Sequence, residues 1–219
     1  MLNRTLTSFA HRISAIIGAK RLYSSHIIRN PSDSAPRIVP TPLTFVSATN
    51  WDHSAHRKGL SILAELYTAK GYTCLDVDLS LSPDATSTSP KLMEYFESEL
   101  DSIVRMSFIP FPPVIIARGV ACLITQTYIS SHPASGLVLI SPPPCNTMIP
   151  RNLLPTPLPE FDFEPKFPIC VVATEEDMQI LQRHNRLVKD QAADVIIVKN
   201  VDGQEAFTKI EQWLDEIGI

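Results

Sequence analysis

The residues Pro113 to Pro142, PVIIARGVACLITQTYISSHPASGLVLISP, decide the fold of this chain. They begin with the β-branched run Val114 to Ile116 and pass through a turn of small residues into a helical stretch from about Val120 to Ser131. A second apolar run, Gly136 to Ile140, follows. Strand, sharp turn, helix and strand in this order form the βαβ unit of a parallel sheet. The stretch therefore predicts an α/β fold.

The rest of the chain, read outward from this unit, alternates in the same way. Apolar runs predict strands at residues 43–48, 72–77, 113–117, 136–140, 169–173 and 194–198. Helical spacing of apolar residues predicts helices at 60–70, 90–104, 120–131, 178–191 and 205–217. Such alternation predicts a three-layer α/β/α domain with a mainly parallel sheet of about six strands. The strand ending at Ala117 should be central.

Composition and charge limit the classes of protein that this chain can be. The 219 residues are 44% hydrophobic, which is enough for one substantial core. The net charge of −4 argues against nucleic acid as a main partner. No apolar run approaches the roughly 20 residues of a membrane-spanning helix. The four cysteines show neither CxxC spacing nor histidine pairing, so no zinc site, disulfide framework or cofactor is predicted.

The first 30 residues differ from the rest in charge. They hold five basic residues and no acid, and apolar residues recur among them at helical spacing. The run Arg21-Leu22-Tyr23-Ser24 resembles a matrix-processing site. We therefore expect residues 1–23 to be a mitochondrial transit peptide, cleaved near Tyr23/Ser24, and the mature protein to lie in the matrix. The alternative is a basic surface helix that the mature protein keeps.

Two further segments interrupt the alternation. Residues 24–42 are polar and proline-rich, so we expect a disordered linker there, before a folded domain of residues 43–219. Between Ser141 and Pro168 stand nine prolines, which exclude a long helix because each removes a backbone donor and clashes with the preceding turn. Within this segment, Glu160 to Phe167 alternates acids with aromatics. That pattern fits either a cover over a vacant pocket or a strip that binds a partner.

The turn of the βαβ unit resembles a known motif. Residues 117–121, Ala-Arg-Gly-Val-Ala, stand where the α/β-hydrolase superfamily places its nucleophile elbow, G-x-S-x-G. The similarity runs from about Pro42 to the C-terminus. It implies the α/β-hydrolase fold in a reduced form, with residues 141–168 in place of a helical lid and without initial antiparallel strands. The chain is similar to a fungal-type mitochondrial member of that superfamily with a degenerate site.

The resemblance implies a triad whose key side chains are absent. The serine position falls on Gly119, where glycine permits a left-handed turn at no steric cost. The acid position falls on Asp177 or Glu176, although acids there also suit the start of a helix. The histidine position falls on Gln204 or Glu205, and no histidine follows the last strand. Since glutamine cannot accept a proton at neutral pH, no triad catalysis is predicted.

The resemblance also implies an oxyanion hole, which needs only backbone donors. The family uses the N–H after the nucleophile, here Val120, and the loop after the first strand, here Ala48, Thr49 and Asn50. Together with Arg118, these residues are expected to form a vestigial pocket for a small carbonyl or carboxylate ligand.

Other reactive side chains give weaker indications. The Asp-His-Ser-Ala-His run of residues 52–56 has a spacing that metal sites use, but no third group of ligands accompanies it, and we predict no metal. Cys122 should point into helix packing. Cys145 and Ser141 should lie at the correct sheet edge, but neither has an identifiable base.

Two functions are compatible with these residues. The first is a catalytically inactive α/β-hydrolase-like protein of mitochondria, acting as a binding or assembly component for an unknown protein partner or small ligand. The second is a hydrolase, of the esterase or thioesterase kind, with an altered site that uses water or a cysteine together with Asp177 or Glu205. The sequence favours the first because both the nucleophile and the base are missing.

Overall fold

A computed structural model describes residues 24–52, 56–81 and 87–219 of the chain. The predicted transit peptide, residues 1–23, and His53 fall outside this part. None of the described helices combines the length and the apolar character that crossing a membrane would need.

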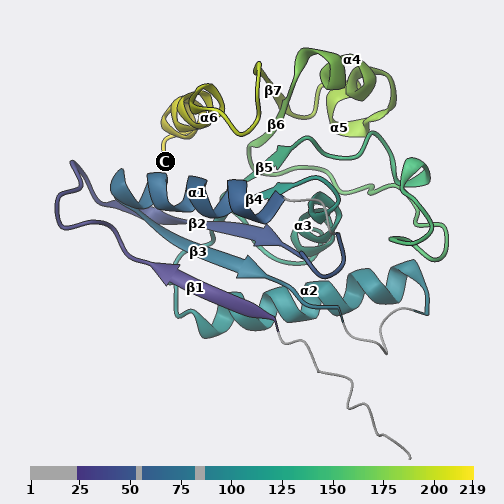
Figure 1. The fold of residues 1–219 in the computed structure, drawn as a ribbon, viewed down its shortest axis with the longest axis horizontal. Helices are drawn as coiled ribbons and strands as arrows, with labels where there is room; N and C mark the ends of the chain where they lie inside the picture. Colours follow the sequence, from purple (N-terminus) through teal and green to yellow (C-terminus); the bar gives the residue numbers. More distant parts are fainter. Residues whose placement is uncertain (1–23, 53–55, 82–86) are drawn as a thin grey trace, which may run out of the picture.

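The described strands form one seven-stranded sheet in the order β1-β3-β2-β4-β5-β6-β7 (Figure 1). Their bounds are β1 Ser25–Arg29, β2 Val39–Ser47, β3 Tyr72–Asp78, β4 Val114–Arg118, β5 Gly136–Ile140, β6 Ile169–Ala173 and β7 Asp194–Ile197. Strands β2 to β7 all pair in parallel, and β4 lies at the centre. The predicted parallel sheet and its central strand are confirmed.

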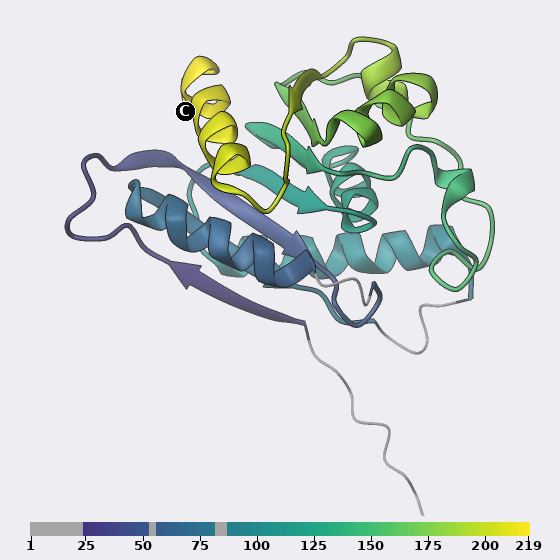
Figure 2. The ribbon, with the colours of Figure 1, turned by 45° about the horizontal axis from the view of Figure 1, so that its top comes forward.

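Helices cover both faces of the sheet. The described helices are α1 His56–Ala69, α2 Ser89–Met106, α3 Ala121–Ile129, α4 Glu175–His184, α5 Arg186–Lys189 and α6 Gln204–Glu216. Helices α1 and α6 pack on one face, and α2 to α5 pack on the other (Figures 1 and 2). The three-layer α/β/α architecture is therefore confirmed. The single helix predicted at 178–191 is divided, because the Asn185 side chain accepts hydrogen bonds from the N–H groups that begin α5.

The central strands are apolar throughout because they are buried on both faces. Along β4, Ile115 packs in the core beneath α2 and α3, whereas Val114 and Ile116 pack in the core beneath α1 and α6. Neighbouring side chains of a strand point to opposite faces, so one short run supplies both cores. This double burial makes the strand readable from the sequence.

The expectation of a disordered linker at residues 24–42 is wrong at both of its ends. Residues 25–29 form β1, which pairs antiparallel with β3, and β2 begins at Val39. Arg29 joins β1 to the domain, with its guanidinium 3.5 Å from the buried carboxylate of Asp76. The run SHIIR has no alternation to mark it as a strand, and it is ordered by the free edge of β3. The expectation of no initial antiparallel strand is corrected in the same way.

Residues 141–168 contain no α-helix, only the 3-10 turn η2, Asn146–Met148. The alternating run at its end turns its aromatic residues inward. Phe161, Phe163 and Phe167 pack against the core beneath α2 and α3, while the acids between them are exposed. The Arg186 guanidinium lies 5.0 Å from the centre of the Phe163 ring. The run is therefore a cover attached to the core through its aromatic rings.

Candidate functional site

The turn after β4, where the resemblance implied the nucleophile, is sharp and left-handed, and it carries a glycine. Gly119 follows the strand with φ of +61°, and its N–H donates to the carbonyl of Ile140 at 2.9 Å. Helix α3 starts two residues later. The predicted left-handed conformation of Gly119 is confirmed. The pairing of Val46 on β2 with Ala117 on β4 brings the loop after β2 beside this turn.

Arg118, which precedes the nucleophile position, reaches the loop between β7 and α6. Its Nη1 and Nη2 atoms donate to the two carboxylate oxygens of Asp202, with Nη2 3.0 Å from Oδ2. The Arg118 side chain is only 11% exposed, and that of Asp202 is 49% exposed. Two parallel hydrogen bonds between a guanidinium and a carboxylate fix direction as well as distance. An ion pair thus ties the elbow to the loop where the resemblance implied a histidine.

Gly59 on α1 leaves room for this ion pair. A Cβ atom at that position would lie 2.5 Å from Asp202 Oδ1 and 3.1 Å from Arg118 Nη1, closer than side chains normally approach. The contact therefore depends on three parts of the chain that are far apart in sequence: the end of β4, the start of α1 and the loop before α6.

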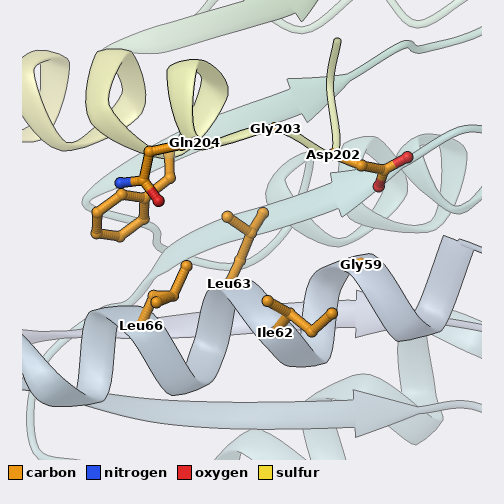
Figure 3. A pocket seen from close by; sticks show the side chains of 8 residues that line it. Gly59, Ile62, Leu63, Leu66, Asp202, Gly203 and Gln204 are labelled. Atoms are coloured by element: carbon orange, nitrogen blue, oxygen red, sulfur yellow. The ribbon is translucent and has the colours of Figure 1, made fainter.

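A pocket of about 390 Å³ separates α1 from the start of α6 (Figure 3). It is lined by Gly59, Ile62, Leu63, Leu66, Asp202, Gly203, Gln204 and Phe207. Figure 3 shows the side chains of Asp202 and Gln204 leaving their loop in different directions. Gln204, the implied histidine position, is the first residue of α6, and no hydrogen bond among the described residues joins it to Gly119.

The candidate acids have structural partners. The Thr174 hydroxyl accepts a hydrogen bond from the Asp177 N–H at 3.3 Å and donates to Asp177 Oδ2 at 3.0 Å, so Asp177 belongs to the cap of α4. Glu205 accepts from the N–H of Lys199 at 3.0 Å and lies 2.9 Å from the Lys209 ammonium. The hydrogen bond from Lys199 has the largest effect on the pKa of Glu205, and the contact with Lys209 adds to it. Both lower this pKa, which makes Glu205 a weaker proton acceptor.

The loop expected to supply the second oxyanion donor is held by a buried carboxylate. The N–H of Thr49 donates to Asp78 Oδ1 at 2.9 Å, and its hydroxyl donates to Oδ2 at 2.7 Å. Ala48 is buried, and the Asn50 amide lies 3.5 Å from the Ser80 hydroxyl. The donor of Thr49 is therefore already engaged. A ligand pocket formed by Ala48, Thr49, Asn50, Arg118 and Val120 stays a prediction.

Ser141 and Cys122, the other nucleophiles weighed for this site, lack catalytic partners among the described residues. Ser141 follows β5 with φ of +44°, but no acid or histidine among the described residues hydrogen-bonds its hydroxyl. Cys122 is fully buried, with Sγ 3.9 Å from the carbonyl of Ile140. Within the described ranges, no group of three or more His, Cys, Asp or Glu side chains could hold a metal ion.

The cysteines give a direct prediction about thiol reactivity. Burial raises the pKa of Cys74 to about 12 and raises the pKa of Cys122 and Cys170 still further above its usual range, so these thiols stay protonated. Cys145 is half-buried. At pH 8 we expect a disulfide reagent such as Ellman's to titrate one thiol rapidly in the folded protein and four in denaturant, with Cys145→Ser abolishing the fast phase. Rapid reaction of Cys122 would contradict the burial.

Sequence reasoning missed three residues that shape this edge. Asp202 lies in the loop before α6, Gly59 lies in the first turn of α1, and Asp78 ends β3. A single acid or glycine in a loop has many uses, and only the distance to Arg118 or Thr49 reveals which one applies. A signal existed for Arg118 alone, since a charged residue at the end of a buried strand needs a partner.

Comparisons with known proteins place the fold. No family model matches the sequence, and no curated protein matches it. An esterase from Thermogutta terrifontis, solved with propionate, shares 14% identity at a TM-score of 0.62 over 91% of this chain and 92% of that one. An α/β hydrolase from a Mar Chica lagoon sediment metagenome shares 12% identity at a TM-score of 0.60, over 90% of this chain and 96% of that one. MenH from S. aureus shares 13% identity at a TM-score of 0.56, over 90% of this chain and 99% of that one. The chain therefore has the α/β-hydrolase fold.

Proposed function

We propose that this chain is a catalytically inactive protein of the α/β-hydrolase fold, a fungal-type mitochondrial member of that superfamily, and that it acts as a binding or assembly component. The observation that carries the proposal is the ion pair of Arg118 and Asp202 beside Gly119. It joins the residue before the expected serine position to the loop that precedes the expected histidine position. Its ligand is a protein or a small molecule with a carbonyl or carboxylate group.

Energetics support this proposal. Removal of the nucleophile or the base from a serine-triad enzyme lowers turnover by around six powers of ten, and what remains comes from the oxyanion donors and substrate binding. In this chain the Thr49 N–H, one of the expected oxyanion donors, already donates to Asp78. The activity that oxyanion donors alone could supply is therefore lower still. The remaining acids, Asp177 and Glu205, serve a helix cap and a lysine contact.

Ester hydrolysis tests the proposal directly. We expect the unmodified protein to hydrolyse p-nitrophenyl esters of short and long acyl chains no faster than buffer does. We also expect no covalent labelling by a fluorophosphonate probe at this edge of the sheet, because Gly119 has no side chain to react and no acid or histidine among the described residues hydrogen-bonds the Ser141 hydroxyl. The measurements are absorbance of released nitrophenol and mass spectrometry of the intact chain and its peptides.

One double variant separates the possible failures. If turnover is found and is lost in the double variant Asp177→Asn, Glu205→Gln, the hydrolase with an altered site is correct. If turnover persists in that variant, another site works, and a probe-labelled peptide containing Ser141 would locate it. Either result would refute catalytic inactivity.

Mitochondrial processing is a separate proposal with its own test. We expect the mature protein to begin at Ser24, because β1 starts at Ser25 and the Ser24 hydroxyl donates to Glu99 Oε2 at 2.8 Å. Cleavage at that bond would keep the whole sheet. N-terminal sequencing of protein recovered from mitochondria gives the answer, and Arg21→Ala should impair cleavage while Arg12→Ala does not. A mature chain that starts at Met1 or Leu2, or after β1, would contradict the proposal.

A further inference from the structure

The loop between α2 and β4 exposes large apolar side chains at the edge of the sheet opposite the elbow. Met106, Phe108 and Phe111 are 57%, 91% and 53% exposed. We call these three residues the apolar tip. From residue 106 to residue 117 the chain has no charged side chain, so the tip is apolar in its surroundings as well. Exposed aromatic side chains grouped in this way mark surfaces that meet a partner or a membrane.

Phe108 is held out by a strained backbone. Its φ is +54°, and its N–H donates back to the carbonyl of Arg105, so it occupies the position after the cap of α2 where glycine or asparagine is usual. A bulky residue in this left-handed conformation is a true outlier. Exposure of the phenyl ring to water is unfavourable, and so is the strained backbone. No contact described within the chain offsets these two costs.

The loop has few backbone N–H groups that are free to donate. Of its seven residues, 107–113, three are prolines and have no N–H. The N–H groups of Ser107 and Phe108 donate back into α2, at 3.0 and 3.4 Å. At the base, Ser135 donates to the carbonyls of Pro112 and Pro113, at 2.7 and 2.9 Å. The loop therefore presents few free donors, while its carbonyls stay in contact with water and headgroups when only its side chains enter the bilayer surface.

The charge beside the tip is basic. Arg105 is exposed in the last turn of α2, and its nearest acid is Asp101, at 3.6 Å. Asp101 also lies 3.3 Å from the Nε2 atom of His132, so its charge is shared between two partners. A cation next to an apolar tip complements an anionic headgroup layer above hydrocarbon.

We propose that the apolar tip inserts into the surface of an anionic lipid bilayer and docks the protein there. The surface fits lipid better than a protein partner because its exposed side chains are apolar, its one neighbouring cation suits a headgroup, and it has few free N–H donors, so it offers little that a protein could pair with in a directional way. Phe108 is the anchor, Met106 and Phe111 flank it, and Arg105 meets the headgroups. The inference stands apart from the elbow and does not depend on whether the chain is catalytic.

A local fluorescence probe tests insertion in the full chain. Binding of vesicles alone would not locate the contact, because the first 30 residues are basic and amphipathic in sequence. The two tryptophans, Trp51 and Trp213, are both buried, so an indole introduced by Phe108→Trp reports its own surroundings. With vesicles of phosphatidylcholine and phosphatidylglycerol that carry bromine in their acyl chains, we expect its emission to shift to the blue and to be quenched.

The matched control is Met148→Trp. Met148 is 58% exposed in η2, at the opposite edge of the sheet, and its indole should remain unquenched. Equal quenching of both variants, or none at Phe108→Trp, would overturn the proposal. If the vesicles bind but the indole of Phe108→Trp is not quenched, the tip does not enter lipid, and a protein would be its partner instead.

Three further variants separate docking from folding. Because an exposed phenyl ring gains most of its transfer energy on entering lipid, Phe108→Ser should lower partition into these vesicles about tenfold or more, and Met148→Ser less than about twofold. Phe108→Gly should lose the same binding while raising the thermal midpoint by roughly 2–4 °C, since glycine relieves the left-handed strain. A lower midpoint in Phe108→Gly, or unchanged partition in Phe108→Ser, would refute the anchor.

Discussion

Replacement of Gly71 by alanine is expected to lower the stability of the fold strongly, and far more than the same replacement at Gly218. Gly71 joins α1 to β3 with φ of +103°, and a Cβ there would lie 1.8 Å from the backbone carbonyl oxygen of Arg37. That oxygen cannot move freely, because the next residues begin β2 and the Val39 N–H donates to the Gly71 carbonyl at 2.9 Å. The collision and the strain together should cost about 3–5 kcal/mol of unfolding free energy.

The control for Gly71→Ala is Gly218→Ala. Gly218 also has a positive φ, +84°, but a Cβ there would meet nothing within 4 Å. It should lose only the conformational term of about 1–2 kcal/mol. Urea denaturation followed by circular dichroism gives both values. Equal losses in the two variants would show that Arg37 is not packed against this turn.

Removal of Arg29 should also be strongly destabilising, because it leaves the buried carboxylate of Asp76 unpaired. The guanidinium lies 3.5 Å from Asp76 Oδ2 and donates to the Ser61 hydroxyl at 3.1 Å. Ser61 in turn donates to the same carboxylate oxygen at 2.9 Å, and it would be the remaining partner in this group of contacts. We expect Arg29→Met to cost about 3 kcal/mol, since the charge stays buried when its partner leaves.

Two variants test whether the buried charge causes this loss of stability. Arg37→Met removes a comparable pair with Asp215, at 2.6 Å, in which both side chains are about half exposed, and it should cost less than about 1 kcal/mol. The double variant Arg29→Met, Asp76→Leu should recover most of the loss, because no uncompensated charge remains. If Arg29→Met proves as mild as Arg37→Met, β1 is only loosely attached to the sheet.

The sequence alone was sufficient for the elements whose residues are buried on both sides. Strands β4 and β5 and helix α3 were predicted within one or two residues, because a doubly buried strand is an apolar run and a short turn of small residues separates it from the helix. The left-handed Gly119 was predicted for the same local reason: its neighbours and its place after a strand determine its backbone.

Elements that depend on a distant partner were missed. Strand β1 is a run of five residues with no pattern, and the edge of β3 orders it. The break between α4 and α5 comes from one side chain, Asn185, that competes with the helix for backbone donors. Neither feature leaves a periodic signal.

The sequence by itself determined the fold class, the central βαβ unit, the glycine at position 119 and the absence of a histidine after the last strand, because these follow from residue types and local spacing. Only the tertiary structure decided which side chains meet beside them. Arg118 and Asp202 are separated by 84 residues. Their ion pair exists because the parallel strands β4 and β7 end at the same edge of the sheet, the loop after β7 reaches Arg118, and Gly59 leaves the space. Hydrophobic periodicity is a local property of a chain, whereas the distance between two charges is set by the whole fold.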